Sequence, residues 1–178
     1  MADAVEAGKV RAVGVSNYSS EQLRVAHAAL AERGIALAAH QVEYSLLHRA
    51  PEVNGVLDAC RELGITLIAY QPLAMGVLTG KYRPGDRPKG IRRLDRSFRR
   101  AGLEKVQPVV ALLREIGARH SKTPAQVALR WLIKQESILP IPGAKDGRQA
   151  ASNAEALSFT LAQAEVEALD RATTAWRR

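Results

Sequence analysis

The stretch SILPIPGAKDGRQAASNAEAL, residues 137–157, places a glycine and a lysine between an apolar run and a helical pattern. Gly143 ends the run, Lys145 follows it, and Asp146 with Gln149 fits the capping box of a helix. The N-terminus of a helix favours negative charge, because its first backbone N–H groups lack partners within the helix. A lysine beside such a start indicates a phosphate site. The alternative interpretation is a solvated surface lysine.

Polar or glycine-containing residues also follow three earlier apolar runs. They are SN at 16–17, QVEYS at 41–45 and YQPLAMG at 70–76. In parallel α/β folds, ligands bind at the carboxyl ends of the strands, so we expect these stretches to share one site. The competing interpretations are turn residues at 16–17, a satisfied polar group in a strand at Gln41 and an ordinary core aromatic at Tyr70.

Four strand–helix units must position these residues. Apolar runs predict strands at 9–17, 37–45, 65–73 and 137–143. Helical patterns lie at 19–34, 51–64, 104–119 and 123–135, and two more helices finish the chain, the last starting near Thr160. The alternation predicts an α/β fold with parallel strands and right-handed crossovers. A closed barrel needs eight such units, so four indicate half a barrel or a small open sheet.

Individual residues refine these elements. The run 65–73 is almost continuously apolar, which is typical of a strand buried on both faces, and Pro140 weakens the fourth strand. The helix at 51–64 carries one apolar stripe, which consists of Val53, Val56, Leu57 and Cys60. Cys60 is therefore interpreted as a small buried hydrophobe. Capping boxes are predicted for Ser19 with Gln22 and for Thr123 with Gln126.

The composition is that of an ordinary globular protein, with 47% hydrophobic and 25% charged residues. No apolar run is long enough to cross a bilayer, and the N-terminal residues lack the pattern of a signal peptide. A single cysteine excludes an internal disulfide and fits a reducing compartment. We therefore expect a cytoplasmic protein, or an organellar one if a targeting segment precedes Met1. The four histidines show no metal-ligand spacing, so no metal is expected.

The formal net charge of +8 admits a nucleic acid, a membrane surface or a phosphorylated ligand as partner. The densest basic stretch is KYRPGDRPKGIRRLDRSFRR, residues 81–100. It has few aromatic residues and so lacks the stacking groups of single-strand binders. We interpret it either as a solvated loop or as part of a phosphate site, and we do not expect a nucleic-acid partner.

Four motifs in order carry a resemblance: GKVRAVGVSNYS, HQVEYSLLHR, LGITLIAYQPLAMGVLTGKY and PIPGAKDGRQAASNAEAL. Over residues 3 to 170, approximately, the chain resembles the C-terminal half of the aldo/keto reductases. The resemblance implies the C-terminal half of a (β/α)8 TIM barrel that binds NADP(H) in extended form and reduces small carbonyl compounds by hydride transfer. It also implies that residues 1–178 are a single partial domain, with the N-terminal half of the barrel absent.

The resemblance assigns cofactor-binding residues position by position. Ser16, Asn17 and Gln41 match residues that bond the nicotinamide carboxamide, and Tyr70 matches the aromatic on which the ring stacks. The turn along the pyrophosphate matches Gln71, Pro72, Leu73 and Gly76. The segment that grips the 2′-phosphate and adenine matches Gly143, Lys145, Gln149 and Asn153. Gln71 stands where the family usually has serine, although an amide can also donate.

The resemblance assigns no catalytic residue to this chain. The family's Asp, Tyr, Lys and His come from the first four strands, upstream of the first motif here, and none of this chain's four tyrosines matches the catalytic position. A half barrel would also leave two strand edges open, so we expect it to self-associate or to pair with a missing half. The alternative function is a non-catalytic nucleotide-binding or regulatory subunit, because relatives of this kind sit on membrane channels.

Overall fold

The computed structural model describes residues 1–86, 88, 90, 94 and 96–178. Its centre is a parallel sheet in which each strand pairs with the next along the chain, in the order β1-β2-β3-β4. The strands are β1 Val13–Ser16, β2 Leu37–Glu43, β3 Thr66–Tyr70 and β4 Ile138–Pro140. Because the sheet does not close on itself, β1 and β4 are open edges within the described part of the chain.

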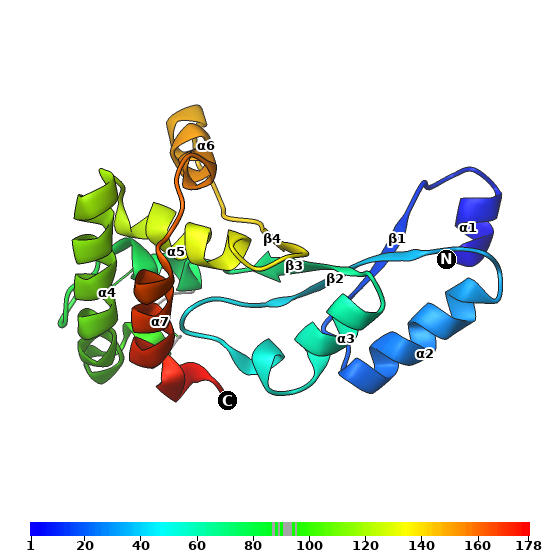
Figure 1. The fold of residues 1–178 in the computed structure, drawn as a ribbon, viewed down its shortest axis with the longest axis horizontal. Coiled ribbons are helices and arrows are strands. Elements are labelled where there is room, and N and C mark those ends of the chain that lie inside the picture. The colour runs from blue at the N-terminus through cyan, green and yellow to red at the C-terminus, as the bar shows by residue number, and fades with distance from the viewer. Residues whose placement is uncertain (87, 89, 91–93, 95) are drawn as a thin grey trace.

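Helices alternate with these strands, as the sequence predicts. They are α1 Ala2–Glu6, α2 Ser20–Ala31, α3 Val56–Glu62, α4 Arg100–His120, α5 Pro124–Ile133, α6 Gly147–Ala154 and α7 Gln163–Ala172. Figure 1 shows α2 and α3 along one side of the strands, and α4, α5 and α7 gathered at the far end of the sheet. The helix α6 stands apart from this group, just beyond the carboxyl end of β4.

Two helices begin at the predicted capping boxes. The Ser19 hydroxyl accepts from the Gln22 N–H at 3.2 Å, and the Ser19 N–H donates to Gln22 Oε1 at 2.9 Å. Thr123 and Gln126 make the same reciprocal pair at 3.3 and 2.8 Å. Each box satisfies two N–H groups that the helix cannot satisfy itself.

The helix predicted at 51–64 is shorter than expected. It begins at Val56, after a 3-10 turn at Ala50–Glu52 and a left-handed Gly55 with φ of 80°. The Asn54 side chain accepts from the Val56 N–H at 3.1 Å, which fixes the later start. Including Val53 in the apolar stripe is therefore wrong, since Val53 is 53% exposed. The rest of the stripe, Cys60 included, is buried as predicted.

Three other boundaries also differ from the prediction. The strand predicted at 9–17 is ordered as a strand only from Val13. The strand predicted at 137–143 ends at Pro140, because Pro140 and Pro142 have no N–H to donate to a ladder. The helix predicted from 104 begins one turn earlier, at Arg100, where the Arg100 guanidinium bonds Glu104 at 2.9 Å.

Burial alternates along β3, so the expectation that it is buried on both faces is wrong. Leu67 and Ala69 are completely buried beneath the helices, whereas Thr66, Ile68 and Tyr70 are only half-buried. β2 shows the same contrast between buried Val42 and half-buried neighbours. The physical reason is that helices cover one face of the sheet, while no described element covers the other.

Candidate functional site

The carboxyl ends of β1, β2 and β3 bring four predicted residues together, here called the Asn17 cluster: Ser16, Asn17, Gln41 and Tyr70. Ser16 lies opposite Gln41 in the sheet, and its hydroxyl donates to the Gln41 carbonyl at 3.0 Å. The Asn17 N–H donates to the same carbonyl at 2.9 Å. The Tyr70 hydroxyl donates to Asn17 Oδ1 at 3.2 Å. Residues far apart in the sequence are therefore held in one hydrogen-bonded group.

The backbone at Asn17 explains why an asparagine suits this position. Its φ of 57° lies in the left-handed region, which asparagine tolerates better than most residues. The turn brings the Asn17 amide to the Tyr70 hydroxyl. In the described part of the chain, the Gln41 side-chain amide has no hydrogen-bond partner, so it is available to a ligand.

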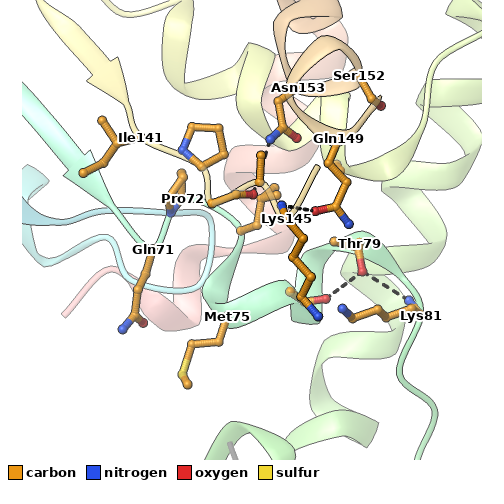
Figure 2. Close-up of a pocket in the computed structure, with 16 residues that line it drawn as sticks. Gln71, Pro72, Met75, Thr79, Lys81, Ile141, Lys145, Gln149, Ser152 and Asn153 are labelled. Atoms are coloured by element: carbon orange, nitrogen blue, oxygen red, sulfur yellow. Dashed lines mark hydrogen bonds between the residues drawn. The ribbon is translucent and has the colours of Figure 1, made fainter. Parts of the chain in front are cut away.

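The remaining eight predicted residues all line a second feature, a pocket of about 500 Å³ here called the lysine pocket (Figure 2). They are Gln71, Pro72, Leu73, Gly76, Gly143, Lys145, Gln149 and Asn153. The loop after β3, the turn after β4 and helix α6 supply them. Gln71 directly follows Tyr70, so the lysine pocket continues from the Asn17 cluster.

The loop after β3 reaches the pocket through an uncommon backbone path. Gln71, Ala74 and Met75 have φ values of 50°, 47° and 53°, and Gly76 has 97°. Such left-handed conformations in non-glycine residues are costly and occur preferentially at functional sites. The Thr79 hydroxyl donates to the Gly76 carbonyl at 2.7 Å and holds the end of the loop (Figure 2).

The start of α6 shapes the opposite wall. The Asp146 carboxylate accepts from the Gln149 N–H at 2.8 Å, as a helix cap should. The second half of the predicted capping box is wrong, because Gln149 Oε1 accepts from the Lys145 N–H at 2.8 Å and not from Asp146. The Asn153 amide donates to the Gly143 carbonyl at 3.5 Å. Gln149 and Asn153 therefore fix the turn that carries Lys145.

The charge of the lysine pocket is one-sided. Lys81 and Lys145 line it, and no Asp or Glu among the described residues does so. Figure 2 shows both lysine side chains extended at the pocket, with Thr79 nearby. Two exposed ammonium groups without a carboxylate beside them favour an anionic ligand, because each can still form a charge-assisted hydrogen bond.

Lys81 is the site residue that the sequence prediction missed. Its signal was present, because it follows the pocket loop directly in LTGKY and begins the basic stretch 81–100. Much of that stretch (87, 89, 91–93 and 95) lies outside the described residues. The interpretation of the whole stretch as a solvated loop or as part of a phosphate site therefore stays a prediction.

Two buried groups lie behind the Asn17 cluster. His40 is completely buried, and its Nε2 accepts from the Tyr18 N–H at 3.0 Å. Its Nδ1 lies 3.9 Å from the Cys60 sulfur. Burial lowers the pKa of His40 and raises the pKa of Cys60 to about 11. Cys60 is thus a protonated, unreactive thiol at neutral pH.

Tyr44 and Tyr82 have structural roles. The Tyr44 hydroxyl is buried, donates to Glu52 at 2.9 Å and accepts from Gln135 at 2.7 Å. Burial and the neighbouring Glu52 carboxylate raise the pKa of Tyr44. The Tyr82 ring packs edge-on against Phe98. Neither is placed as a proton donor to a ligand in the lysine pocket.

A second polar pocket, of about 510 Å³, has a different character. Its central group is here called the Arg49 network and consists of Arg49, Glu52, Asp170 and Arg177. The buried Arg49 guanidinium contacts Glu52 at 2.7 Å and Asp170 at 3.0 Å, and Arg177 contacts Glu52 at 3.1 Å. These charges are already paired, so this pocket is a weak candidate for a ligand site.

Among the described residues, no group of three or more His, Cys, Asp or Glu side chains is arranged to hold a metal ion. In the same part of the chain, no helix combines the length and the apolar character needed to cross a membrane.

The sequence matches the model of a known protein family. The model of the "Aldo/keto reductase family" matches residues 1–174. The chain is 43% identical over 160 residues to a chloroplastic pyridoxal reductase of Arabidopsis thaliana, covering 90% of this chain and 43% of that protein. It is 38% identical over 174 residues to an aldo-keto reductase of Schizosaccharomyces pombe named with NADP(+), covering 94% and 49%.

Solved structures agree with the fold. The glycerol dehydrogenase AKR11B4 from Gluconobacter oxydans superposes with a TM-score of 0.84 at 27% identity, over 97% of this chain and 52% of that one. A thermostable aldo-keto reductase bound to the inhibitor epalrestat gives 0.74 at 26% identity, over 97% and 52%. The chain spans about half the length of the curated relatives it matches. Its four parallel strand–helix units fit the C-terminal half of a (β/α)8 barrel.

Proposed function

Because this chain belongs to the aldo/keto reductase family, we propose that it is the cofactor-binding half of an NADP(H)-dependent reductase of aldehydes or ketones. The observation that carries the proposal is the lysine pocket, where two lysines meet no carboxylate among the described residues. NADP(H) carries a pyrophosphate and a 2′-phosphate, which such a pocket suits. When bound, the cofactor supplies hydride exchange between its nicotinamide C4 and a carbonyl carbon.

The lysine pocket would hold the phosphates and the adenosine. Lys145 is proposed to pair with the 2′-phosphate, while Gln149 and Asn153 contact the adenine and hold the Lys145 turn. Lys81 and the Gln71 amide would face the pyrophosphate. The hydrogen bond that the Lys145 N–H donates to Gln149 Oε1 supports this assignment, because it orients the turn before any ligand arrives. The name of the S. pombe relative, which contains NADP(+), supports the choice of cofactor.

The Asn17 cluster would hold the nicotinamide. Ser16, Asn17 and Gln41 offer hydroxyl and amide groups to its carboxamide, and the Tyr70 ring offers a stacking surface. The exposed Ser16 and Asn17 and the half-buried Tyr70 support this role, since a ligand can reach all three. Their continuity with Gln71 allows one extended ligand to span both features.

The family's catalytic Asp, Tyr, Lys and His are proposed to come from a second four-stranded half. Two edges of the sheet and one of its faces lack cover in the described structure. Leu139 and Ile141 at the β4 edge are 52% and 43% exposed. Leu139 also borders an apolar pocket of about 350 Å³ between β4, α5 and α6, which suits further apolar elements.

The test is an equilibrium titration of the 178-residue chain with NADPH and NADH, followed by nicotinamide fluorescence. We expect saturable NADPH binding and an affinity for NADH lower by about tenfold or more, because NADH lacks the 2′-phosphate. A protein that also contains the second half should oxidise NADPH in the presence of an aldehyde. Failure of the chain to bind NADPH would contradict the proposal, and binding without turnover by the longer protein would favour a regulatory subunit.

A further inference from the structure

The turn between β1 and α2 is held against β2 by three hydrogen bonds. Two of them, from the Ser16 hydroxyl at 3.0 Å and from the Asn17 N–H at 2.9 Å, go to the Gln41 backbone carbonyl. The third runs from the Tyr18 N–H to Nε2 of His40 at 3.0 Å. Within the described structure, His40 is thus the one β2 residue whose side chain bonds this turn. The Gln41 carbonyl is present whatever residue occupies that position, whereas the third bond depends on the identity of residue 40.

The hydrogen bond defines the chemical form of the ring. An N–H donor at Tyr18 requires a lone pair on Nε2, so the imidazole is neutral with its proton on Nδ1. That proton faces the Cys60 sulfur at 3.9 Å. Two titratable groups lie against the His40 ring: the Cys60 thiol from α3 and the Tyr18 phenol from the turn. The Tyr18 and His40 rings meet edge-on, with their centroids 6.5 Å apart. Neither group is a carboxylate, so none of the described residues in contact with the ring would pair with an imidazolium.

We propose that His40 is a positioning residue for the nicotinamide end of the site: its neutral ring fixes Tyr18 and thereby holds Asn17 against Tyr70. The proposal rests on the proposed function and deepens it. Asn17 precedes Tyr18 and has a left-handed backbone, so a shift of Tyr18 rotates the Asn17 amide directly. The bond of 3.2 Å from the Tyr70 hydroxyl to Asn17 Oδ1 carries that constraint to the proposed stacking surface.

Protonation of His40 removes its ability to hold the turn. An imidazolium has a proton on each nitrogen and accepts no hydrogen bond. The bond from the Tyr18 N–H is then lost, and the turn is released from β2 at its third contact. Binding at the nicotinamide end should weaken in acid for this reason, whereas the lysine pocket has no contact with the ring.

The experiment compares His40→Leu with His40→Gln, using two ligands. NADPH probes the whole site, and adenosine 2′,5′-bisphosphate probes only the lysine pocket. His40→Leu removes the acceptor, so we expect NADPH affinity to fall about tenfold while the bisphosphate affinity changes less than about twofold. His40→Gln retains a carbonyl acceptor and should recover most of the loss. Circular dichroism establishes that each variant is folded.

A pH series separates positioning from simple packing. As the pH falls from about 8 to the lowest value at which circular dichroism shows a folded protein, the wild type should lose more NADPH affinity than His40→Gln, because only the wild type loses its acceptor. The comparison between the two proteins cancels the titration of the ligand itself. Equal pH profiles, or equal losses of both ligands in His40→Leu, would reduce His40 to a core residue and overturn the proposal.

Amide hydrogen exchange in the absence of a ligand tests directly whether the His40 ring holds the turn. Amide exchange at Tyr18 should be slow in the wild type and in His40→Gln and fast in His40→Leu. If neither ligand binds the wild type, the proposed function fails, and the cofactor role of His40 fails with it. If only adenosine 2′,5′-bisphosphate binds, the lysine pocket stands and the positioning role is overturned. Unchanged exchange in a folded His40→Leu would show that the ring does not hold the turn.

Discussion

Two polar pockets among the described residues have almost the same volume, about 500 and 510 Å³, but one is lined by charges of both signs and the other by cations alone. The Arg49 network fills one with cations and carboxylates that already contact each other. The lysine pocket holds Lys81 and Lys145 and, among the described residues, no acidic side chain. Size alone would rank the two equally as candidate sites.

The difference teaches that unpaired charge marks a ligand site better than the amount of charge does. In a buried ion pair, the attraction between the two charges is offset by the cost of removing them from water. Little electrostatic attraction then remains for a ligand. Two lysines around a pocket without acids retain their attraction for an anion. The net charge of +8 by itself pointed equally to nucleic acid, membrane or phosphate, whereas the pairing of charges indicates where on the molecule an anion can bind.

The largest effect is expected from breaking the Arg49 network. Arg49→Ala should destabilise the fold by about 3–5 kcal/mol, because it leaves Glu52 and Asp170 without their main partner. The side chains of Arg49 and Glu52 are only 6% and 9% exposed. Urea unfolding measures the loss. Arg24→Ala, which breaks an exposed pair with Glu62, is the control and should change stability little. Similar values for the two variants would remove the distinction between the pockets.

The next largest effect is expected from reversing one charge in the lysine pocket. Lys145→Glu should weaken NADPH binding by roughly 30- to 100-fold, because it places a carboxylate beside the proposed 2′-phosphate. NADH binding should change only a few-fold. The exposed position of Lys145 predicts an unchanged unfolding curve. Arg148→Glu alters the same charge on α6 outside the pocket lining and is the matched control. An equal loss for NADPH and NADH would contradict the phosphate assignment.

A smaller effect concerns His40, a buried titratable group that belongs to neither pocket. Burial places its folded pKa below the ordinary 6.5, so the unfolded chain binds a proton that the folded chain does not. The free energy of unfolding should therefore be undiminished above 6.5 and should decrease as the pH falls from there toward the lowered pKa. His40→Gln lacks this component. Carboxylates such as Glu165 change the free energy of unfolding only at lower pH. Hydrogen bonds from His120 and Ala162 outweigh burial and keep the pKa of Glu165 below 4.5.

The smallest effect tests the backbone that shapes the lysine pocket. Gln71 is exposed and has a φ of 50°, so Gln71→Gly should stabilise the fold by about 0.5–1 kcal/mol. The same change removes an amide donor and should lower NADPH affinity by about threefold. Gly76→Ala is the opposite control, since its φ of 97° makes a side chain costly. A loss of stability in Gln71→Gly would show that the loop stores no strain.

Local signals predicted much of the fold. The capping boxes at Ser19 and Thr123 depend on residues three apart, so the sequence reveals them directly. The late start of α3 was missed because it depends on the left-handed backbone of Gly55. The half-open face of β3 was missed because apolar composition cannot tell whether a second layer is present.

The grouping of the candidate site residues was predictable where a motif covers them, and their role in binding a cofactor stays a prediction. All eight predicted residues from Gln71 to Asn153 line the lysine pocket, and the other four form the Asn17 cluster. Lys81 was missed because its place at the pocket follows from the left-handed path through Met75 and Gly76. The role of Gln149 was misjudged in part, since its reach to Lys145 depends on how the turn meets α6.

The Arg49 network can be completed only late in the synthesis of the chain. The carbonyl and carboxylate of Asp170 that meet Arg49 lie 121 residues further along the chain. At typical translation rates of about 5–20 residues per second, Asp170 is made roughly 6–24 seconds after Arg49. During that interval Arg49 and Glu52 cannot be enclosed as they are in the finished fold. The nascent polypeptide therefore emerges from the ribosome with β1 and β2 already made and the surroundings of Arg49 still incomplete.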